Sequence, residues 1–419
     1  MAEKNPTHKI TRRDFTKLSV ASGVAMIAAS PRAIAETNSG TLKVGLLGCG
    51  GRGSGAAAQM LQGNDNVKLI AMADIFPDRV EQRLHRYERS TDERIASKVD
   101  VKPDHQFVGI NAYKEILKTD IDVLIEGTLP YCRPKHVSAA VDAGKHIFTE
   151  KPGAVDPVGI RILLDAAKRA DEKGLHIVTG TQRRHQKSYV DTIKKIHDGA
   201  IGDVVAMRAY WCGTLPFVHE RSKKWETELE YRLRNWYSNC WVCGDNIIEQ
   251  HIHNIDVMNW VKDDFPESVF ASGGRTWKPD EERFGDIYDH FSCDYVYPDG
   301  THMTSMSRHW EGDGGVFEEV VGTKGKSNCR DMGQDDEDPY VQEHINLVNS
   351  IRGKGPRLNE LERMAKSTLT AMMGRMSAYT GKRVTWEEAM TSDLSIVPEL
   401  DWNASYPVGP VPAPGAHKI

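Results

Sequence analysis

Three glycines near the start of the chain have the spacing of a nucleotide-binding turn. Gly48, Gly50 and Gly53 follow the apolar run 42–47 and precede an alanine-rich stretch that favours a helix. The first glycine permits a tight turn, the second lets a pyrophosphate approach the backbone, and the third lets helix and strand pack closely. The helix N-terminus, which contains Gly51, supplies NH groups and the positive end of the helix dipole. The motif predicts a dinucleotide site.

An acidic residue follows the second strand-like run at the distance that such a site requires. Residues 67–73 are apolar and β-prone, and Asp74 ends the run about 20 residues beyond the last glycine. A carboxylate there accepts hydrogen bonds from the ribose hydroxyls and repels a 2′-phosphate. Asp74 therefore indicates NAD as the cofactor, although the nearby Arg79 leaves NADP as an alternative.

A lysine lies where a parallel sheet binds its ligands. The runs 121–125 and 144–149 read as strands, with a helix expected over 134–143 between them. The second run leads directly into Glu150 and Lys151, and loops at the carboxyl ends of parallel strands line the ligand crevice. Lys151 is expected to point into this crevice; the alternative is a solvated lysine on a surface loop.

Aromatic residues gather in an otherwise polar segment. Four of the nine tryptophans lie between residues 210 and 241, among them Trp211 and Trp236, with Tyr237 beside them. Aromatic faces can pack on the C–H face of a sugar ring while Arg and Glu bind its hydroxyls. The segment is either a sugar-binding surface or a small core beneath a long loop.

No pattern typical of a metal site or a serine nucleophile is present. Glu249, His251 and His253 cluster near Cys240 and Cys243, but neither group has the spacing of a structural zinc site. A redox dithiol would follow a strand at a helix start, which this pair does not. We expect no metal at this cluster. Cys240 and Cys243 are expected to be buried thiols, and a local disulfide between them is the alternative.

The arrangement of strands and helices predicts an α/β protein built from two domains. Strand–helix alternation covers residues 40–183, whereas 184–340 contains strands expected at 204–212, 268–273, 288–297, 301–308 and 316–321, and Asp299 with Gly300 marks a hairpin turn. Helical apolar spacing between 340 and 381 predicts two bracing helices within a C-terminal segment, 341–419.

Composition narrows the possible partners of the chain. Its 419 residues carry a formal charge of −5 without a Lys/Arg-dense block, which argues against nucleic acid and anionic lipid. The apolar stretch 18–30 is too short for the roughly 20 residues that span a bilayer. Seven cysteines, an odd and small number, imply no disulfide framework.

The first 35 residues resemble a twin-arginine export signal. Arg12 and Arg13 precede Phe15, an apolar run from Leu18 and a small-x-small cleavage site that ends at Ala35. Thr16 departs from the leucine that is common in such signals. We expect recognition by the twin-arginine export machinery and a periplasmic or otherwise exported mature protein; a basic tail or an amphipathic helix is the alternative.

The motifs together resemble the Gfo/Idh/MocA (glucose-fructose oxidoreductase, inositol dehydrogenase) superfamily over nearly the whole mature chain. The resemblance rests on the glycine turn, Asp74, the loop at Thr128 and Pro130 followed by His136, the sequence 144–152, the segment 180–184 and the segment 244–256. It implies an N-terminal Rossmann domain and a C-terminal α/β domain with an open, mostly antiparallel sheet. Glu249 stands where the family more often has Asp, and His251 where it has Gly.

The resemblance also implies roles for individual residues. His253, whose imidazole has a near-neutral pKa when unperturbed, is expected to act as acid/base, and Lys151 to orient and polarise the substrate oxygen. Glu249 is expected either to support these two residues or to contact a substrate hydroxyl. The implied NAD contacts are Gly48, Gly50, Gly51, Arg52, Gly53, Asp74, Thr128, Pro130, His136, Glu150, Lys151, Gln182 and Arg183. Candidate substrate contacts are Arg184, Trp211, Trp236, Tyr237 and Asp256.

These residues favour an NAD-dependent oxidoreductase that acts on a secondary hydroxyl of a sugar, glycoside or polyol. The alternative is a glycosidase that uses NAD in an oxidation, elimination and reduction cycle; a sugar-binding module that retains NAD is a third hypothesis. Because the exported compartment offers no obvious pool of free NAD, we expect the cofactor to be loaded before export, held tightly and recycled in place. Arg52, Arg183 or Arg184 would close over the pyrophosphate. We also expect a dimer or tetramer through one uncovered sheet face near Phe291, Val296, Met303 and Met306.

Overall fold

The first sheet has six parallel strands in the order β3-β2-β1-β4-β5-β6. The computed structural model describes residues 40–417. The strands are β1 Leu42–Leu47, β2 Val67–Asp74, β3 Gln106–Val108, β4 Val123–Glu126, β5 His146–Thr149 and β6 Ile177–Thr179. This is the Rossmann order, which reverses between β1 and β4 and opens a crevice at their carboxyl ends. The predicted Rossmann fold is confirmed.

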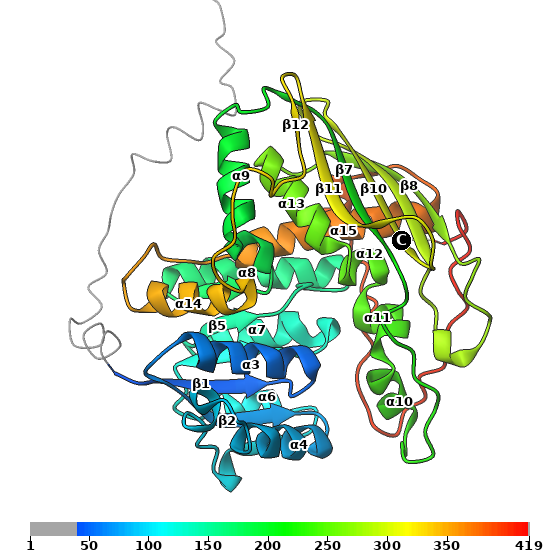
Figure 1. Ribbon diagram of the computed structural model, residues 1–419. Coiled ribbons are helices and arrows are strands. Elements are labelled where there is room, and N and C mark those ends of the chain that lie inside the picture. Colours follow the sequence, from blue (N-terminus) through cyan, green and yellow to red (C-terminus); the bar gives the residue numbers. More distant parts are fainter. Residues whose placement is uncertain (1–39, 418–419) are drawn as a thin grey trace, which may run out of the picture. The chain divides into compact units, whose positions relative to one another are not determined.

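Helices cover both faces of this sheet, which explains why its strands are apolar on both sides (Figure 1). The longer ones are α3 Gly51–Gly63, α4 Pro77–Glu88, α7 Arg133–Asp142 and α8 Pro157–Glu172, and the short ones are α5 Glu93–Ala96 and α6 Ala112–Ile116. Helix α7 matches the helix expected over 134–143. Single turns of 3-10 helix occur at η1 Pro103–His105 and η2 Pro130–Cys132.

The second sheet has seven strands in the order β12-β11-β7-β10-β9-β8-β13. They are β7 Val204–Gly213, β8 Ser268–Gly274, β9 His290–Val296, β10 His302–His309, β11 Gly315–Gly322, β12 Lys326–Ser327 and β13 Val384–Thr385. Only β7 and β10 pair in parallel, and β9 and β10 form the predicted hairpin with Gly300 at φ 82°. The expected mostly antiparallel sheet is confirmed.

Helices from distant parts of the chain pack on one face of the second sheet (Figure 1). They are α12 Asn246–Glu249, α13 Ile252–Lys262 and α15 Leu361–Thr380. On β10, Met303 and His309 are buried beneath these helices whereas His302 and Thr304 are exposed. Side chains alternate between the two faces of a strand, so the helices leave the opposite face uncovered.

This alternation corrects one expectation about the uncovered face. Phe291 and Met303, which we expected there, are 1% and 0% exposed and lie on the helix-covered side. Phe291 and Val296 also differ in parity along the strand, so they cannot share a face. Met306, by contrast, does lie on the uncovered side, because its neighbours Ser305 and Ser307 are buried.

The C-terminal segment braces both sheets. Helices α14 Pro339–Ile351 and α15 confirm the two predicted helices, and the chain continues through α16 Trp386–Thr391 into an extended tail. Helix α14 packs on α3, where Gly63 leaves no room for a side chain against Val341. The remaining elements are η3 Gln182–His185, α9 Lys187–His197, α10 Glu228–Arg234, η4 Trp236–Ser238, α11 Cys240–Cys243 and η5 Glu282–Phe284.

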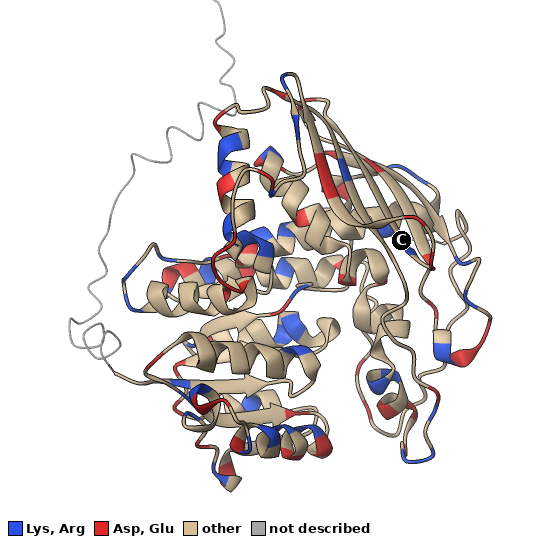
Figure 2. Ribbon diagram, viewed as in Figure 1, with Lys and Arg blue, Asp and Glu red and all other residues tan. Residues whose placement is uncertain are grey.

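One apolar core runs through both halves of the described chain, from Leu47 of β1 in the first sheet to Ala389 of α16. The domain boundaries at 183 and 340 therefore stay predictions. The proposed signal, 1–35, lies outside the described residues. Within residues 40–417, no helix combines the length and apolar character needed to cross a bilayer. Acidic and basic side chains are interspersed on the helices, as on α4 (Figure 2).

Candidate active site

The glycine turn between β1 and α3 combines two tightly packed glycines with two open ones. Gly48 has φ +95°, and a Cβ there would lie 2.6 Å from the Gly127 carbonyl carbon. A Cβ on Gly53 would overlap the Gly48 carbonyl oxygen. Gly50 and Gly51 instead have nothing within 4 Å of an added Cβ. Close contacts within the protein require glycine at positions 48 and 53. The open space at Gly50 and Gly51 fits a cofactor pyrophosphate.

Asp74 lies at the end of β2 beside this turn. Its carboxylate accepts the backbone NH of Cys49 at 2.6 Å and that of Phe76 at 2.9 Å. Burial raises the pKa of Asp74, although these two bonds oppose the shift. Each carboxylate oxygen keeps a further acceptor site, so the residue fits the ribose hydroxyls of NAD.

Thr128 and His136 belong to a buried network at the end of β4. Glu126 accepts from Arg133 at 3.1 Å and from the Thr128 hydroxyl, and His136 Nδ1 lies 3.2 Å from that hydroxyl. Burial opposes a charge on His136, but Cys132 and Glu126 outweigh it and raise its pKa to about 9. Arg133 also donates to the Pro152 carbonyl at 2.6 Å. The network thus fixes the loop that carries Pro130 to the loop that carries Lys151.

Glu126 and Arg133 were missed from the sequence. An acidic residue that ends a buried strand was a usable signal, but its arginine partner follows seven residues later on α7. Both side chains are almost fully buried, at 0% and 5% exposure. Removing either partner of a buried ion pair destabilises the fold. Glu126 and Arg133 therefore stabilise the edge of the sheet at which the cofactor is expected to bind.

Lys151, Glu249 and His253 converge at the carboxyl edge of the first sheet. The Lys151 ammonium donates to the Glu249 carboxylate at 2.9 Å and to its backbone carbonyl at 2.6 Å. Glu249 ends α12 and His253 lies in the first turn of α13. The His253 ring stacks on Trp211 of β7 with centroids 5.9 Å apart. The second domain therefore presents an acid and an imidazole to a lysine of the Rossmann domain.

The electrostatics keep His253 neutral. Burial lowers its pKa well below the ordinary value, and the charges of Lys151, Arg183 and Arg52 lower it further. This differs from the near-neutral pKa that the sequence interpretation assumed. A neutral imidazole can accept a proton from a hydroxyl group, and the surrounding cations favour an oxyanion next to it.

Arg52 lies on the first turn of α3 and is bound by acidic residues. Its guanidinium donates to Glu150 at 2.6 Å, lies 3.7 Å from Glu343 and covers the ring of Tyr340. Glu343 is fully buried, and burial followed by the charge of Glu150 raises its pKa well above the ordinary value. Arg52 thus connects the glycine turn with the loop after β5 and with α14.

Gln182 and Arg183 line a cavity of about 220 Å³ next to Tyr340. The Gln182 side-chain oxygen is buried without a hydrogen-bond partner among residues 40–417. Arg183 pairs with Glu318 of β11, which also accepts from Asn254 at 2.5 Å. The unpartnered amide oxygen is consistent with a cofactor contact.

The structure does not bring the other candidate substrate residues to this cluster. Arg184 and Asp256 bind each other at 2.8 Å, and Asp256 also accepts from Ser367 at 2.7 Å. Tyr237 is 1% exposed, and its hydroxyl donates to Gln250 at 2.7 Å. Trp236 packs on the Tyr237 ring. Of the candidate aromatic residues, Trp211 is the one in contact with His253.

The family departure at His251 has a structural explanation. His251 is fully buried and its Nε2 lies 2.7 Å from the Ser305 hydroxyl of β10. Burial lowers the pKa of His251 to about 3, so the ring is neutral. His251 therefore attaches the loop between α12 and α13 to the sheet.

The seven cysteines, all within the described chain, are free thiols. Cys240 and Cys243 are buried, and burial raises the pKa of each thiol. Among residues 40–417, no three His, Cys, Asp or Glu side chains are arranged to hold a metal ion.

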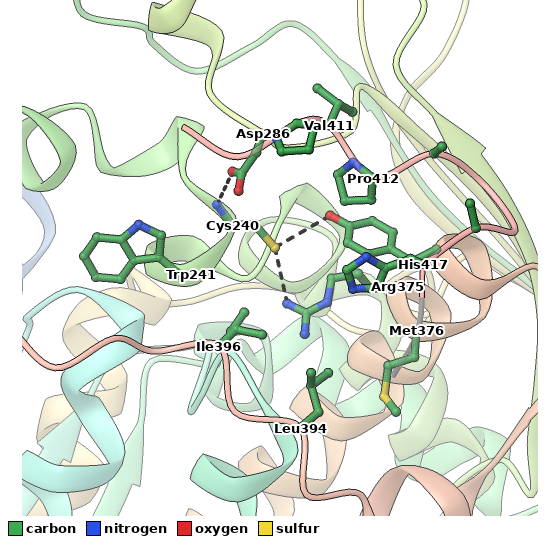
Figure 3. A pocket seen from close by; sticks show the side chains of 14 residues that line it. Cys240, Trp241, Asp286, Arg375, Met376, Leu394, Ile396, Val411, Pro412 and His417 are labelled. Carbon is green, nitrogen blue, oxygen red and sulfur yellow. Dashed lines mark hydrogen bonds between the residues drawn. The ribbon is translucent and has the colours of Figure 1, made fainter. Parts of the chain in front are cut away.

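A separate cavity of about 540 Å³ lies between α11, α15 and the C-terminal tail (Figure 3). Cys240, Arg375 and Asp286 line it, together with apolar residues such as Ile396 and Val411. Lys151, Glu249 and His253 are not among its lining residues. The cavity is therefore distinct from the cluster that these three residues form.

Two family models match this chain. One, described as an oxidoreductase family with an NAD-binding Rossmann fold, matches residues 42–177. The other, the Gfo/Idh/MocA C-terminal domain, matches residues 190–327.

The inositol 2-dehydrogenase of Salmonella typhimurium is 26% identical over 222 residues, which cover 53% of this chain and 54% of that protein. The inositol 2-dehydrogenase/D-chiro-inositol 3-dehydrogenase of Lactiplantibacillus plantarum is 26% identical over 225 residues, 53% of each chain. The matches thus span about half the length of these relatives.

Solved structures share the fold. The scyllo-inositol dehydrogenase from Lactobacillus casei with bound NAD(H) and scyllo-inositol has a TM-score of 0.64 at 18% identity, and covers 82% of this chain and 99% of that one. The aldose-aldose oxidoreductase from Caulobacter crescentus complexed with glycerol has a TM-score of 0.64 at 16% identity, with the same coverage.

Proposed function

Because the chain belongs to the Gfo/Idh/MocA oxidoreductase family, with the family's NAD-binding Rossmann fold, we propose that it oxidises a secondary hydroxyl of a sugar, glycoside or polyol. The observation that carries the proposal is the convergence of Lys151, Glu249 and His253 at the loop after β5, which Arg52 connects to the glycine turn. Relatives named as inositol dehydrogenases make a polyol or a sugar the first substrates to test.

The side chains divide the chemistry between them. Neutral His253 accepts the hydroxyl proton, and the Lys151 ammonium donates a hydrogen bond to the same oxygen and stabilises its developing negative charge. Glu249 holds Lys151 through the 2.9 Å bond. Bound NAD would accept the hydride from the carbinol carbon, which leaves a ketone. Asp74 and the open space at Gly50 would hold the adenosine ribose and the pyrophosphate.

The test compares Lys151→Ala and His253→Ala with the unaltered protein on a panel of polyols, sugars and chromogenic glycosides. Loss of a positioned acid/base group lowers turnover by about 100-fold to 10,000-fold, and calorimetry should show that both variants still bind NAD. Full turnover in either variant would remove that residue from the mechanism.

The same panel separates the alternative function. Release of the chromogenic leaving group without net NADH would instead indicate the oxidation, elimination and reduction cycle. Ketone formed without release of a leaving group supports the oxidoreductase, with at most one NADH per protein if the cofactor stays bound.

We further propose that the protein is exported after folding and keeps its NAD bound. The support is the twin-arginine pattern of the first 35 residues, together with Arg52, which connects the cofactor turn to Glu150 and Tyr340. Arg52, Arg183 and Arg184 each pair with an acidic residue, but Arg52 lies on the first turn of α3, next to the open space at Gly50 and Gly51. Arg52 is therefore the stronger candidate for closing over the pyrophosphate.

Denaturing protein that was purified without added cofactor tests the retention. We expect absorbance and mass spectra of the released material to show NAD at near-stoichiometric amount, and Arg52→Ala to lose most of it. A cofactor-free protein that becomes active only with added NAD would contradict retention, and the fold would be unaffected.

A further inference from the structure

A further cavity, a broad hollow distinct from the two described above, opens beside the cluster of Lys151, Glu249 and His253. It is lined by the chain after β7, at Leu215 and Phe217, by Trp277 after β8, and by His309 and Trp310 at the end of β10. Its volume is about 880 Å³. Trp277 is 51% exposed although it is a large apolar residue. A broad hollow lined by tryptophan rings with hydroxyl groups, such as that of Thr276, has the character of a carbohydrate surface.

The hollow adjoins the acid that positions Lys151. His309 Nε2 lies 3.1 Å from the side-chain oxygen of Gln250, which directly follows Glu249 in the chain. Phe217 contacts the Tyr237 ring at 5.7 Å, and the Tyr237 hydroxyl donates to the same Gln250 oxygen. The wall of the hollow is therefore bonded to the loop that carries Glu249.

Strand register gives the spacing between the hollow and the catalytic cluster. In the parallel pair β7 and β10, Trp211 lies opposite Ser307 and Gly213 opposite His309. His309 is thus two residues beyond Trp211 along the sheet, a step of about 7 Å. Trp211 stacks on His253, so a ring bound at His253 and a ring bound in the hollow would be neighbours.

His309 adds an unsatisfied polar group. It is 1% exposed, and its Nδ1 has no hydrogen-bond partner within residues 40–417. Its Nε2 lies 3.1 Å from both the Gln250 side-chain oxygen and the Tyr237 hydroxyl. Burial lowers the pKa of His309 well below the ordinary value, so the imidazole is neutral.

We propose that the hollow is a subsite for a second pyranose ring, so that the substrate is a glycoside of at least two rings instead of a free monosaccharide or polyol. The proposal rests on the proposed function, because it takes the first ring to bind at Lys151 and His253. Trp277 and Trp310 stack on the second ring, and the chain after β7 supplies further apolar lining.

Saturation-transfer NMR titrations test the subsite through binding instead of turnover. The probes are glucose with maltose and cellobiose, galactose with lactose, and N-acetylglucosamine with chitobiose. We expect at least one disaccharide to bind about tenfold more tightly than its monosaccharide, because stacking of a ring on aromatic side chains contributes about that much affinity. The W277A/W310A double variant should lose that gain and keep the affinities for the monosaccharide and for NAD.

Phe270→Ala is the matched control, because Phe270 is 52% exposed but lies on the uncovered face of β8, outside the hollow. It should keep the disaccharide preference. The subsite is overturned if no disaccharide binds more tightly than its monosaccharide, or if the preference survives in W277A/W310A. Failure of the proposed function would appear separately, as full turnover of Lys151→Ala or His253→Ala.

Discussion

In the proposed mechanism, Glu249 acts on the reaction through Lys151. Its carboxylate and its backbone carbonyl both accept from the ammonium, so the backbone bond survives a side-chain change. We expect Glu249→Gln to leave Lys151 less well oriented and to lower kcat by about 100-fold, the effect of misplacing a reacting group by about 1 Å. KM and NAD affinity should change little.

Glu249→Asp is the informative companion variant. If the carboxylate only positions Lys151, the shorter acid, which is the commoner residue in the family, should restore part of kcat. Equal kcat for Glu249→Gln and the unaltered enzyme would show that Lys151 needs no such partner.

The His253 environment predicts an unusual pH dependence. Burial and then the Lys151, Arg183 and Arg52 charges lower its pKa, so the ring stays unprotonated and able to accept a proton below its ordinary pKa of about 6.5. We expect kcat/KM to hold its plateau through pH 6.5 and to fall only in more acidic solution.

Removing one of these cations should move the His253 pKa upward. Lys151→Gln abolishes a positive charge, which favours the imidazolium, and NMR of histidine-labelled protein reads the titration without any turnover. A His253 pKa that is unchanged or lower in this variant would contradict the electrostatic account.

At the scale of elements, the glycine turn contains one glycine that the fold requires, Gly53, and one that cofactor binding is expected to require, Gly50. Gly53→Ala would force a Cβ into the Gly48 carbonyl and should cost about 1–3 kcal/mol in the free energy of unfolding, as overpacking does. Gly50→Ala meets no protein atom within 4 Å and has φ −68°, so its stability should be unchanged.

Gly50→Ala, which should leave stability unchanged, should weaken NAD binding. A methyl group on Gly50 occupies the space that the pyrophosphate needs, and NAD affinity measured by calorimetry should fall by about tenfold or more. Unaltered NAD affinity in Gly50→Ala would place the pyrophosphate elsewhere.

Local patterns made the Rossmann half predictable, because a glycine turn, a buried strand and an acidic strand end lie within about 30 residues of each other. The second half depends on contacts distant in sequence. Asp256 binds Arg184, 72 residues earlier, so the sequence could not show that the two neutralise each other. The aromatic residues of the hollow come from the segments after β7, β8 and β10, which are distant from one another in sequence. The cluster that is local in sequence contains Trp236 and Tyr237, which are partly and fully buried.

The uncovered face of the second sheet argues for an oligomer of the whole molecule. Phe317 of β11, Tyr210 of β7 and Met306 of β10 lie opposite one another in register, and the Phe317 and Tyr210 rings are 4.8 Å apart. Phe317 is 38% exposed and Phe270, farther along the sheet, is 52% exposed. An apolar row on a sheet face without helices is typical of a surface that a second copy covers.

We therefore expect a dimer or tetramer at micromolar concentration, with an interface of about 800 Å² or more per partner on this face. Phe317→Glu places a charge in the apolar row, and burying this unpaired acid in an interface is unfavourable. Light scattering should show that this variant is monomeric, and circular dichroism should show that its fold is retained. A charge change on α4, Arg86→Glu, is the control, because it leaves the sheet untouched and should keep the oligomer. A monomer before any substitution would contradict the assignment of this face.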